Sequence, residues 1–139
     1  MKYAKIFMLA LCILAVLPGS LSALGTQELF FNTVPAPRLI SPVTEIVNLA
    51  GKDTLKFSWS PHETAAGFKM YNDFRIYKGY ETKENTLIFK NRVKPNEWNI
   101  NVGSALFENN QVYTWSLKFV FSEGRNSQKS YQSFKVIKN

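Results

Sequence analysis

The amino-acid sequence predicts an all-β protein, a seven-stranded antiparallel β-sandwich built from short strands. Apolar residues alternate with polar ones in short runs, and clusters of Gly, Pro, Asn and Ser separate these runs. Beyond residue 22, no stretch carries the sustained i, i+3, i+4 apolar spacing that is typical of an amphipathic helix. Because each strand has one apolar face to hide from water, two sheets packed face to face satisfy the pattern.

Residues 1–22 are expected to form a removable export signal. A positively charged start, Met1–Lys5, precedes the unbroken apolar run Ile6–Leu17, and Ser20-Leu21-Ser22 supplies the small residues of a cleavage site. The 12 apolar residues make a helix of about 18 Å, which is shorter than the hydrocarbon core of about 30 Å. The sequence therefore predicts a secreted or periplasmic protein with no stable membrane span after cleavage, and an uncleaved anchor is the alternative.

The rest of the chain is expected to form one domain that is stabilised by its core alone. Lys2 and Lys5 belong to the signal, which leaves 15 basic and 10 acidic residues among 117, a net charge of +5. The only cysteine, Cys12, also lies in the signal, so disulfides and thiol chemistry are excluded from the remainder. We expect an extended lead segment over residues 23–36 and a folded domain over residues 37–139.

The first two predicted strands differ in regularity. The first, residues 38–47, is interrupted by Pro42 and is therefore expected at the edge of a sheet. The second, residues 55–60, alternates strictly and stops at Pro61. Its inward side chains are Leu55, Phe57 and Trp59.

The third predicted strand covers residues 73–78, with Arg75 and Tyr77 expected to point outward. The fourth covers residues 86–90, and the fifth follows the turn after it. The inward side chains are Phe74 and Ile76 in the third strand, and Trp98, Ile100 and Val102 in the fifth.

The sixth predicted strand, residues 113–121, has the clearest pattern, because a large apolar residue occupies every second position. The seventh, residues 131–137, closes the set. The inward side chains are Tyr113, Trp115, Leu117, Phe119 and Phe121 in the sixth strand, and Phe134 and Val136 in the seventh.

Three features of these strands point to a known family. The second strand ends in Phe57-Ser58-Trp59-Ser60-Pro61, Phe107 precedes Tyr113 at the start of the sixth, and Ser133–Val136 completes a last hairpin. Over roughly residues 37–139 the chain resembles the fibronectin type III module. The resemblance implies an immunoglobulin-like sandwich with Trp59 in its core, and an immunoglobulin-like relative of another strand order is the alternative.

The role of Tyr113 can also be argued without the family. Its ring can be buried while its hydroxyl binds a backbone group upstream and fixes the corner. In the preceding turn, Asn109-Asn110 stands where the family often has Pro-Gly, and asparagine tolerates the left-handed conformation that such a turn needs. The members of the family best known for cell adhesion display Arg-Gly-Asp in the last hairpin loop, whereas residues 122–127 here do not match it, so the resemblance implies no adhesion site.

The sequence does not favour an enzyme, a metal site or a cofactor. His62 is the only histidine and is expected to be a solvated loop residue, because no second histidine or cysteine accompanies it. The acids Glu81, Glu84, Glu97 and Glu108 fall in separate turns, with no spacing that forces a pair together. A hydrolase whose acids converge in space remains the least favoured alternative.

The charges and exposed rings instead predict a binding module. The basic residues are scattered, and Lys90, Arg92 and Lys94 form the only local stripe, so a nucleic acid is not expected as partner. An anionic polysaccharide or membrane headgroups remain open, with strong salt dependence as their signature. We therefore expect another protein or a cell-surface polysaccharide as partner.

Five aromatic residues are the candidate contact residues of such a module. Flat exposed rings stack on sugars and anchor protein interfaces, so a carbohydrate-binding accessory domain is the alternative function. The apolar residues of the lead segment either fold back onto the domain or insert into a partner. The candidate residues are Tyr71, Tyr77 and Tyr80 around the third strand, and Phe30 and Phe31 in the lead segment.

Overall fold

The structure is a computed structural model that describes residues 34–62, 70–122 and 124–139, which contain eight strands and two short 3-10 helices, η1 and η2. No helix in this described part of the chain is long and apolar enough to cross a membrane. The elements are β1 (Leu39–Ser41), β2 (Ile46–Asn48), β3 (Thr54–Trp59), β4 (Met70–Lys78), η1 (Glu84–Thr86), β5 (Leu87–Val93), β6 (Asn99–Gly103), η2 (Ser104–Leu106), β7 (Val112–Phe121) and β8 (Ser130–Ile137).

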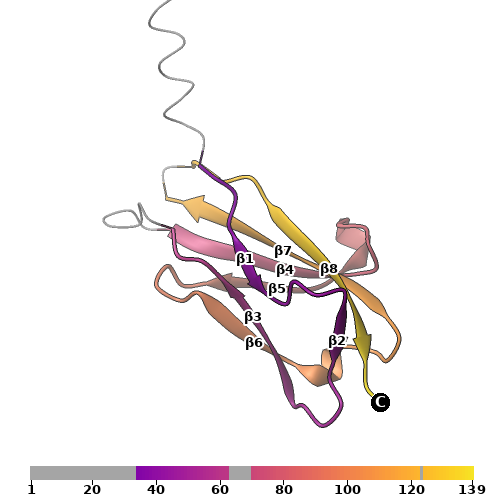
Figure 1. Ribbon diagram of the computed structural model, residues 1–139. Helices are drawn as coiled ribbons and strands as arrows, with labels where there is room; N and C mark the ends of the chain where they lie inside the picture. The colour runs from indigo at the N-terminus through magenta and orange to yellow at the C-terminus, as the bar shows by residue number, and fades with distance from the viewer. Residues whose placement is uncertain (1–33, 63–69, 123) are drawn as a thin grey trace, which may run out of the picture. The chain divides into compact units, whose positions relative to one another are not determined.

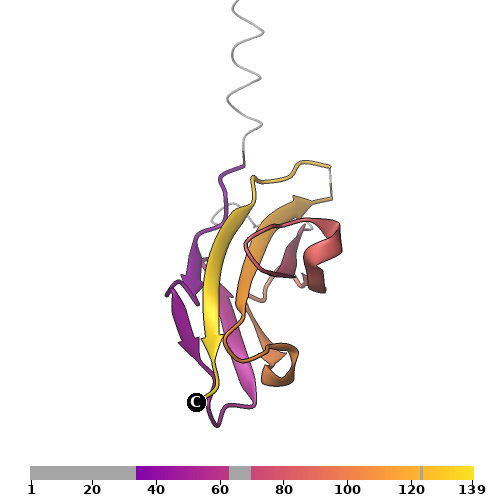
Figure 2. The ribbon, with the colours of Figure 1, turned by 90° about the vertical axis from the view of Figure 1, so that its right-hand side faces the viewer.

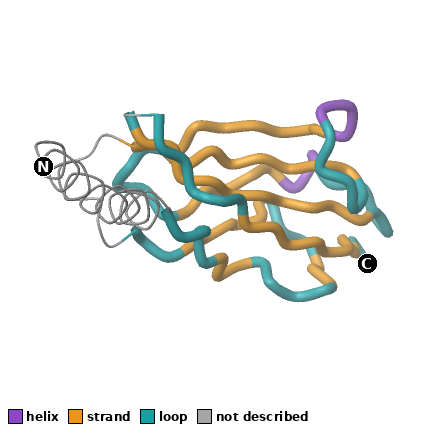
Figure 3. Tube along the Cα trace, turned by 90° about the horizontal axis from the view of Figure 1, so that it is seen from above, coloured by secondary structure: helices purple, strands orange, loops and turns teal. Residues whose placement is uncertain are grey.

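The strands form two sheets within the compact unit Val34–Asn139 (Figure 1). The small sheet has the strand order β1-β3-β6, and the large sheet has the order β2-β8-β7-β4-β5. Seen from above, the strands of both sheets run lengthwise through the unit (Figure 3). The fold is thus all-β with two sheets, as the alternating pattern predicts, and is consistent with a β-sandwich.

The two sheets meet in an aromatic core. Phe57 of the small sheet lies edge-on to Phe74 and Trp115 of the large sheet, with ring centroids 5.0 and 5.2 Å apart. The predicted assignment of inward side chains is confirmed. Those that are buried are Leu55, Phe57, Trp59, Phe74, Ile76, Val102, Tyr113, Trp115, Leu117, Phe119, Phe121, Phe134 and Val136, and Trp98 and Ile100 pack against them.

The prediction of a single first strand over residues 38–47 is wrong. The segment forms two strands in different sheets, because Pro42 has no N–H with which to continue a ladder, and the chain crosses there from the small sheet to the large one. Strands β1 and β2 both lie at sheet edges, as the proline predicts. Since β2 runs parallel to β8, the large sheet is mixed, and the described residues hold eight strands rather than seven antiparallel ones. The crossing is anchored by Trp115, whose Nε1 donates to the Pro42 carbonyl at 3.0 Å.

The corner before β7 has the geometry expected of its tyrosine. The Tyr113 ring is buried against Phe107, with centroids 5.1 Å apart, and its hydroxyl accepts a hydrogen bond from the Glu108 N–H at 2.7 Å. Asn110 has the positive φ of 61° that the sequence allows at this turn. The corner is therefore fixed by one buried ring and one backbone hydrogen bond.

Asn72 is a buried polar residue that the alternation does not reveal. It points inward from β4, is completely buried, and donates from Nδ2 to the carbonyls of Lys94 and Glu97 at 3.1 and 3.0 Å. One side chain thus satisfies two carbonyl oxygens of the turn between β5 and β6. Because a buried carbonyl without a donor costs free energy, Asn72 stabilises this connection.

Candidate functional site

The candidate site is the outer face of the large sheet, the side that faces away from the small sheet. On β4 and β7 the residues between the core positions point to this side, and strand pairing continues the pattern onto β5 and β8. The outer face is formed by Tyr71, Asp73, Arg75 and Tyr77 of β4, Lys90 and Arg92 of β5, Thr114, Ser116 and Lys118 of β7, and Tyr131, Ser133 and Lys135 of β8.

An ion-paired group lies at the centre of this face. The buried Asp73 carboxylate accepts hydrogen bonds from Arg75, from Nε at 3.2 Å and from Nη2 at 3.0 Å. The hydrogen bond to Asp73 raises the pKa of the Arg75 guanidinium above its ordinary value, against the opposing effect of burial. Arg75 also contacts Glu84 of η1 at 3.3 Å. The charge of Asp73 is therefore neutralised within the protein.

Three cations surround this group and form no ion pair with any residue that the structure describes: Lys90, Arg92 and Lys118. In the strand register Asp73 lies between Arg92 and Lys118, and Lys90 lies opposite Arg75. Lys90 and Arg92 are exposed, whereas Lys118 is half-buried. This part of the outer face is therefore positively charged.

The connection between β4 and β5 crosses one end of the outer face. Thr114 donates from Oγ1 to the Gly79 carbonyl at 2.8 Å, and Glu84 reaches Arg75 from η1. Figure 2 shows this connection standing out from the large sheet. Tyr77 lies beside Thr114 in the register and is only 1% exposed, so its ring is not available to a ligand. Tyr77 occupies the outward position that the sequence predicts, but the prediction that it is a contact residue did not take this burial into account.

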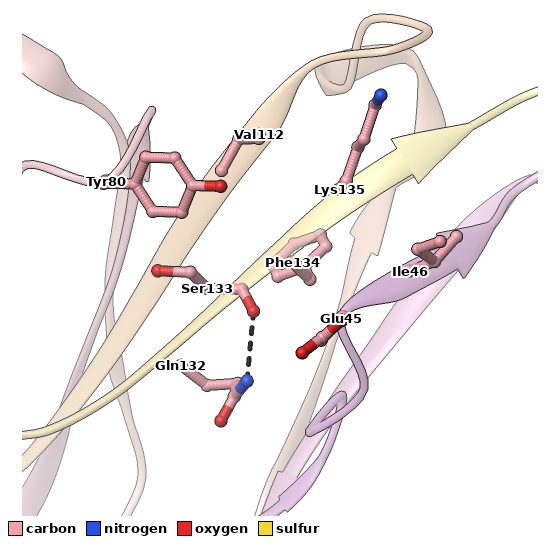
Figure 4. Close-up of a pocket in the computed structure, with 8 residues that line it drawn as sticks. All are labelled: Glu45, Ile46, Tyr80, Val112, Gln132, Ser133, Phe134 and Lys135. Carbon is pink, nitrogen blue, oxygen red and sulfur yellow. Dashed lines mark hydrogen bonds between the residues drawn. The ribbon is translucent and has the colours of Figure 1, made fainter.

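An open groove of about 570 Å³ adjoins the same end of the outer face (Figure 4). Tyr80 stands on one side of it and Glu45 and Ile46 stand on the other, with β8 between them (Figure 4). Ser133 and Lys135 line the groove from β8, together with Val112, Gln132 and Phe134. An elongated ligand can therefore lie along β8 between the ring of Tyr80 and a side formed by the aliphatic Ile46 and the acidic Glu45.

Large apolar side chains are exposed around this groove. Tyr80 is 74% exposed, Ile46 is 58% exposed, and Tyr131, farther along β8, is 50% exposed. Ile40 and Val43 are also exposed, in the segment that contains Pro42. Exposed rings and aliphatic groups close to a groove are typical of binding surfaces.

The structure separates the predicted contact residues. Tyr80 is exposed at the groove, Tyr77 is buried, and the Tyr71 ring is half-buried beneath Arg92, whose guanidinium carbon lies 4.9 Å from the ring centroid. The three tyrosines therefore do not form one exposed cluster. Phe30 and Phe31 lie outside the described residues.

Lys118 and Tyr131 also belong to the outer face, and neither is among the contact residues predicted from the sequence. Each occupies a polar-side position in its strand, which predicts that it faces outward and nothing more. Their proximity depends on the pairing of β7 with β8, in which Ser116 lies opposite Tyr131. Only the strand order brings them together.

The remaining chemical candidates have structural partners. His62 is half-buried, not solvated as expected, and its ring lies 5.2 Å from Phe119 and 5.5 Å from Phe121. Glu81 pairs with Lys83 at 3.0 Å, and Glu108 with Lys78 at 2.9 Å. Within residues 34–62, 70–122 and 124–139, no group of three His, Cys, Asp or Glu side chains could hold a metal ion.

No family model matches the chain, and no curated protein matches it either.

Proposed function

We propose that the protein is an exported, non-catalytic binding module with a fibronectin type III-like fold, and that the outer face of the large sheet is its contact surface. The N-terminal charge and apolar run support export. The two-sheet fold and the hydrogen bond from the Glu108 N–H to the Tyr113 hydroxyl support an immunoglobulin-like relationship.

One observation carries the binding function, the groove between Tyr80 and Ile46. Both side chains are large, apolar and more than half exposed, and they stand on opposite sides of one open groove. A protein gains nothing in its own stability from exposing such groups, whereas a partner that covers them removes apolar surface from water. The groove is therefore the most favourable place on the described surface for a partner to begin contact.

A carbohydrate-binding accessory domain is the second candidate, and the exposure of two tyrosines favours it. Tyr80 and Tyr131 present rings to solvent, and a tyrosine ring can stack on a sugar while its hydroxyl forms a hydrogen bond. This version of the function uses Tyr80 and Tyr131 in place of Tyr71 and Tyr77, since Tyr77 is buried.

Photo-cross-linking tests the contact surface for a protein partner and a sugar partner alike. Tyr80 is replaced with p-benzoylphenylalanine, which reacts with C–H bonds of both kinds of molecule, and the protein is irradiated in the cell-envelope fraction of its source. We expect a discrete cross-linked product. The matched control places the same group at Asn101, which is exposed on the small sheet. Equal products from both positions, or none from Tyr80, would contradict the proposed surface.

A further inference from the structure

The unpaired cations of the outer face have a defined spacing. Arg92 and Lys118 lie on the two strands that flank Asp73, so their backbones are two strand spacings apart, about 10 Å. Lys90 lies two residues from Arg92 along β5, on the same side of the sheet. The three cations thus form a triangle over neighbouring strands.

The positive charge of this triangle is available to a ligand. Asp73 is the one acid between the cations in the register, and Arg75 already neutralises it through a contact at 3.0 Å. Glu84 contacts the same guanidinium at 3.3 Å, so Arg75 and these two acids together carry −1 against the +3 of the three cations, which leaves a net charge of +2. Because Lys118 is half-buried, its charge is less screened by water than that of a fully exposed lysine.

An exposed aromatic ring borders the cations. Tyr131 lies opposite Ser116 on β7, and Lys118 is the next outward residue of β7, so ring and ammonium are diagonal neighbours across the two strands. Tyr131 is half exposed, which leaves one side of the ring open to a ligand. A cation and an open ring on adjacent strands suit a molecule that carries both an acidic group and an apolar ring face.

We propose that the outer face of the large sheet binds an anionic polysaccharide, with acidic groups on Lys90, Arg92 and Lys118 and a sugar ring on Tyr131. This inference rests on the proposed binding function and names the chemical class of its ligand. The separation of about 10 Å between Arg92 and Lys118 is close to the length of a disaccharide, so successive acidic repeats can reach both.

An acidic polypeptide fits this face less well. Extended peptides are usually held by main-chain hydrogen bonds to a free sheet edge. The cations Arg92 and Lys118 instead flank β4, whose backbone is paired with β5 on one side and β7 on the other. Among the described strands the edge of β5 is free, but a peptide paired with it would lie outside the face that Lys118 and Tyr131 occupy on the interior strands β7 and β8. Over β4, β7 and β8 only side chains are offered, in a flat arrangement of charge and ring. A polymer of rigid, acidic rings is the ligand that this arrangement favours.

Calorimetric titration with polygalacturonate tests the proposal, with neutral dextran and poly-glutamate as comparison ligands. The full chain is used in the N-terminally processed form that the expression host yields. We expect polygalacturonate to bind, dextran not to bind, and the affinity to fall steeply when NaCl is raised from about 0.05 to about 0.5 M. The double variant Lys90→Gln/Arg92→Gln is expected to bind about tenfold more weakly. Tyr131→Ala is expected to weaken binding without changing its salt dependence.

The control carries the same loss of charge on the other side of the molecule. Lys52→Gln/Lys56→Gln changes two exposed lysines of the β2–β3 turn and of β3 in the small sheet, and we expect unchanged affinity. An equal loss of affinity in both double variants would overturn the proposal, because it would show that binding depends only on the net charge of the protein and not on the position of the cations. Poly-glutamate binding as tightly as polygalacturonate, with no effect of Tyr131→Ala, would overturn it in favour of an acidic polypeptide. Failure of polygalacturonate to bind would overturn the ligand class, while the cross-linking experiment separately decides the contact surface.

Discussion

Replacing Phe57 with alanine is expected to lower the free energy of unfolding by about 3–5 kcal/mol. Phe57 is completely buried, and its ring contacts Phe74, Phe107, Trp115 and Phe134 at centroid distances of 5.0–6.4 Å. It comes from the small sheet, while Phe74, Trp115 and Phe134 belong to the large one, so its removal opens a cavity where the sheets meet. The melting temperature should fall on the order of 12–20 °C, which thermal unfolding followed by circular dichroism measures.

Two control variants separate this cavity effect from a general sensitivity of β3. Phe57→Leu keeps most of the volume and is expected to cost about 1–1.5 kcal/mol. Lys56→Ala changes the neighbouring exposed residue and is expected to change stability by less than about 0.5 kcal/mol. A Phe57→Ala loss no larger than that of Lys56→Ala would show that the sheets do not pack through this ring.

The isosteric change Asn72→Asp is expected to destabilise the protein by about 3–5 kcal/mol at neutral pH. It replaces a donor with an acceptor that faces the carbonyl oxygens of Lys94 and Glu97, now 3.1 and 3.0 Å from Nδ2. Because the site is completely buried, a carboxylate there is removed from water, and the two groups that Asn72 now binds are both hydrogen-bond acceptors. Urea unfolding measures the loss.

The Asn72→Asp loss should depend on pH. Burial raises the pKa of the new carboxyl above its unfolded value of about 3.9, so between these two pKa values the folded state binds more protons than the unfolded state. The stability contributed by protonation is therefore present below about pH 4 and is lost as the pH rises through the raised pKa. Asn101→Asp, at an exposed position, is the control and should show little change. A loss that is the same at pH 4 and pH 7 would contradict the buried environment assigned to Asn72.

The sequence allowed the core to be predicted because burial imposes a period of two. Every odd position of β7 from Tyr113 to Phe121 is apolar, and each of these side chains is buried. The Tyr113 hydroxyl bond also followed from local chemistry, since a buried phenol needs a partner and the turn upstream offers a free N–H. Features that depend on one strand, or on one turn beside it, could therefore be predicted from the sequence.

Features that depend on which strands are neighbours could not be predicted from the sequence. The crossing at Pro42 places β1 and β2 in different sheets, and the parallel pairing of β2 with β8 joins residues about ninety positions apart. Tyr77 has an outward position in its strand, and its burial comes from a connection that folds back over the sheet. Asn72 has an inward position, where its type argues against burial until the two carbonyl partners are known.

The candidate site was only partly predictable for the same reason. The stripe of Lys90 and Arg92 is visible in the sequence because both residues belong to one strand. Lys118 and Tyr131 join it only through the pairing of β4 with β7 and of β7 with β8. Composition therefore indicated a basic, ring-bearing surface, and the topology decided which of its residues lie together.

Mapping a ligand onto backbone amides by NMR tests the central claim most directly. The claim is that the outer face of the large sheet is the binding surface. On titration of the isotope-labelled protein with polygalacturonate, we predict that the amide signals of Lys90, Arg92, Lys118 and Tyr131 shift, while those of Lys56 and Asn101 on the small sheet stay in place. Shifts confined to the small sheet, or spread evenly over both sheets, would contradict it.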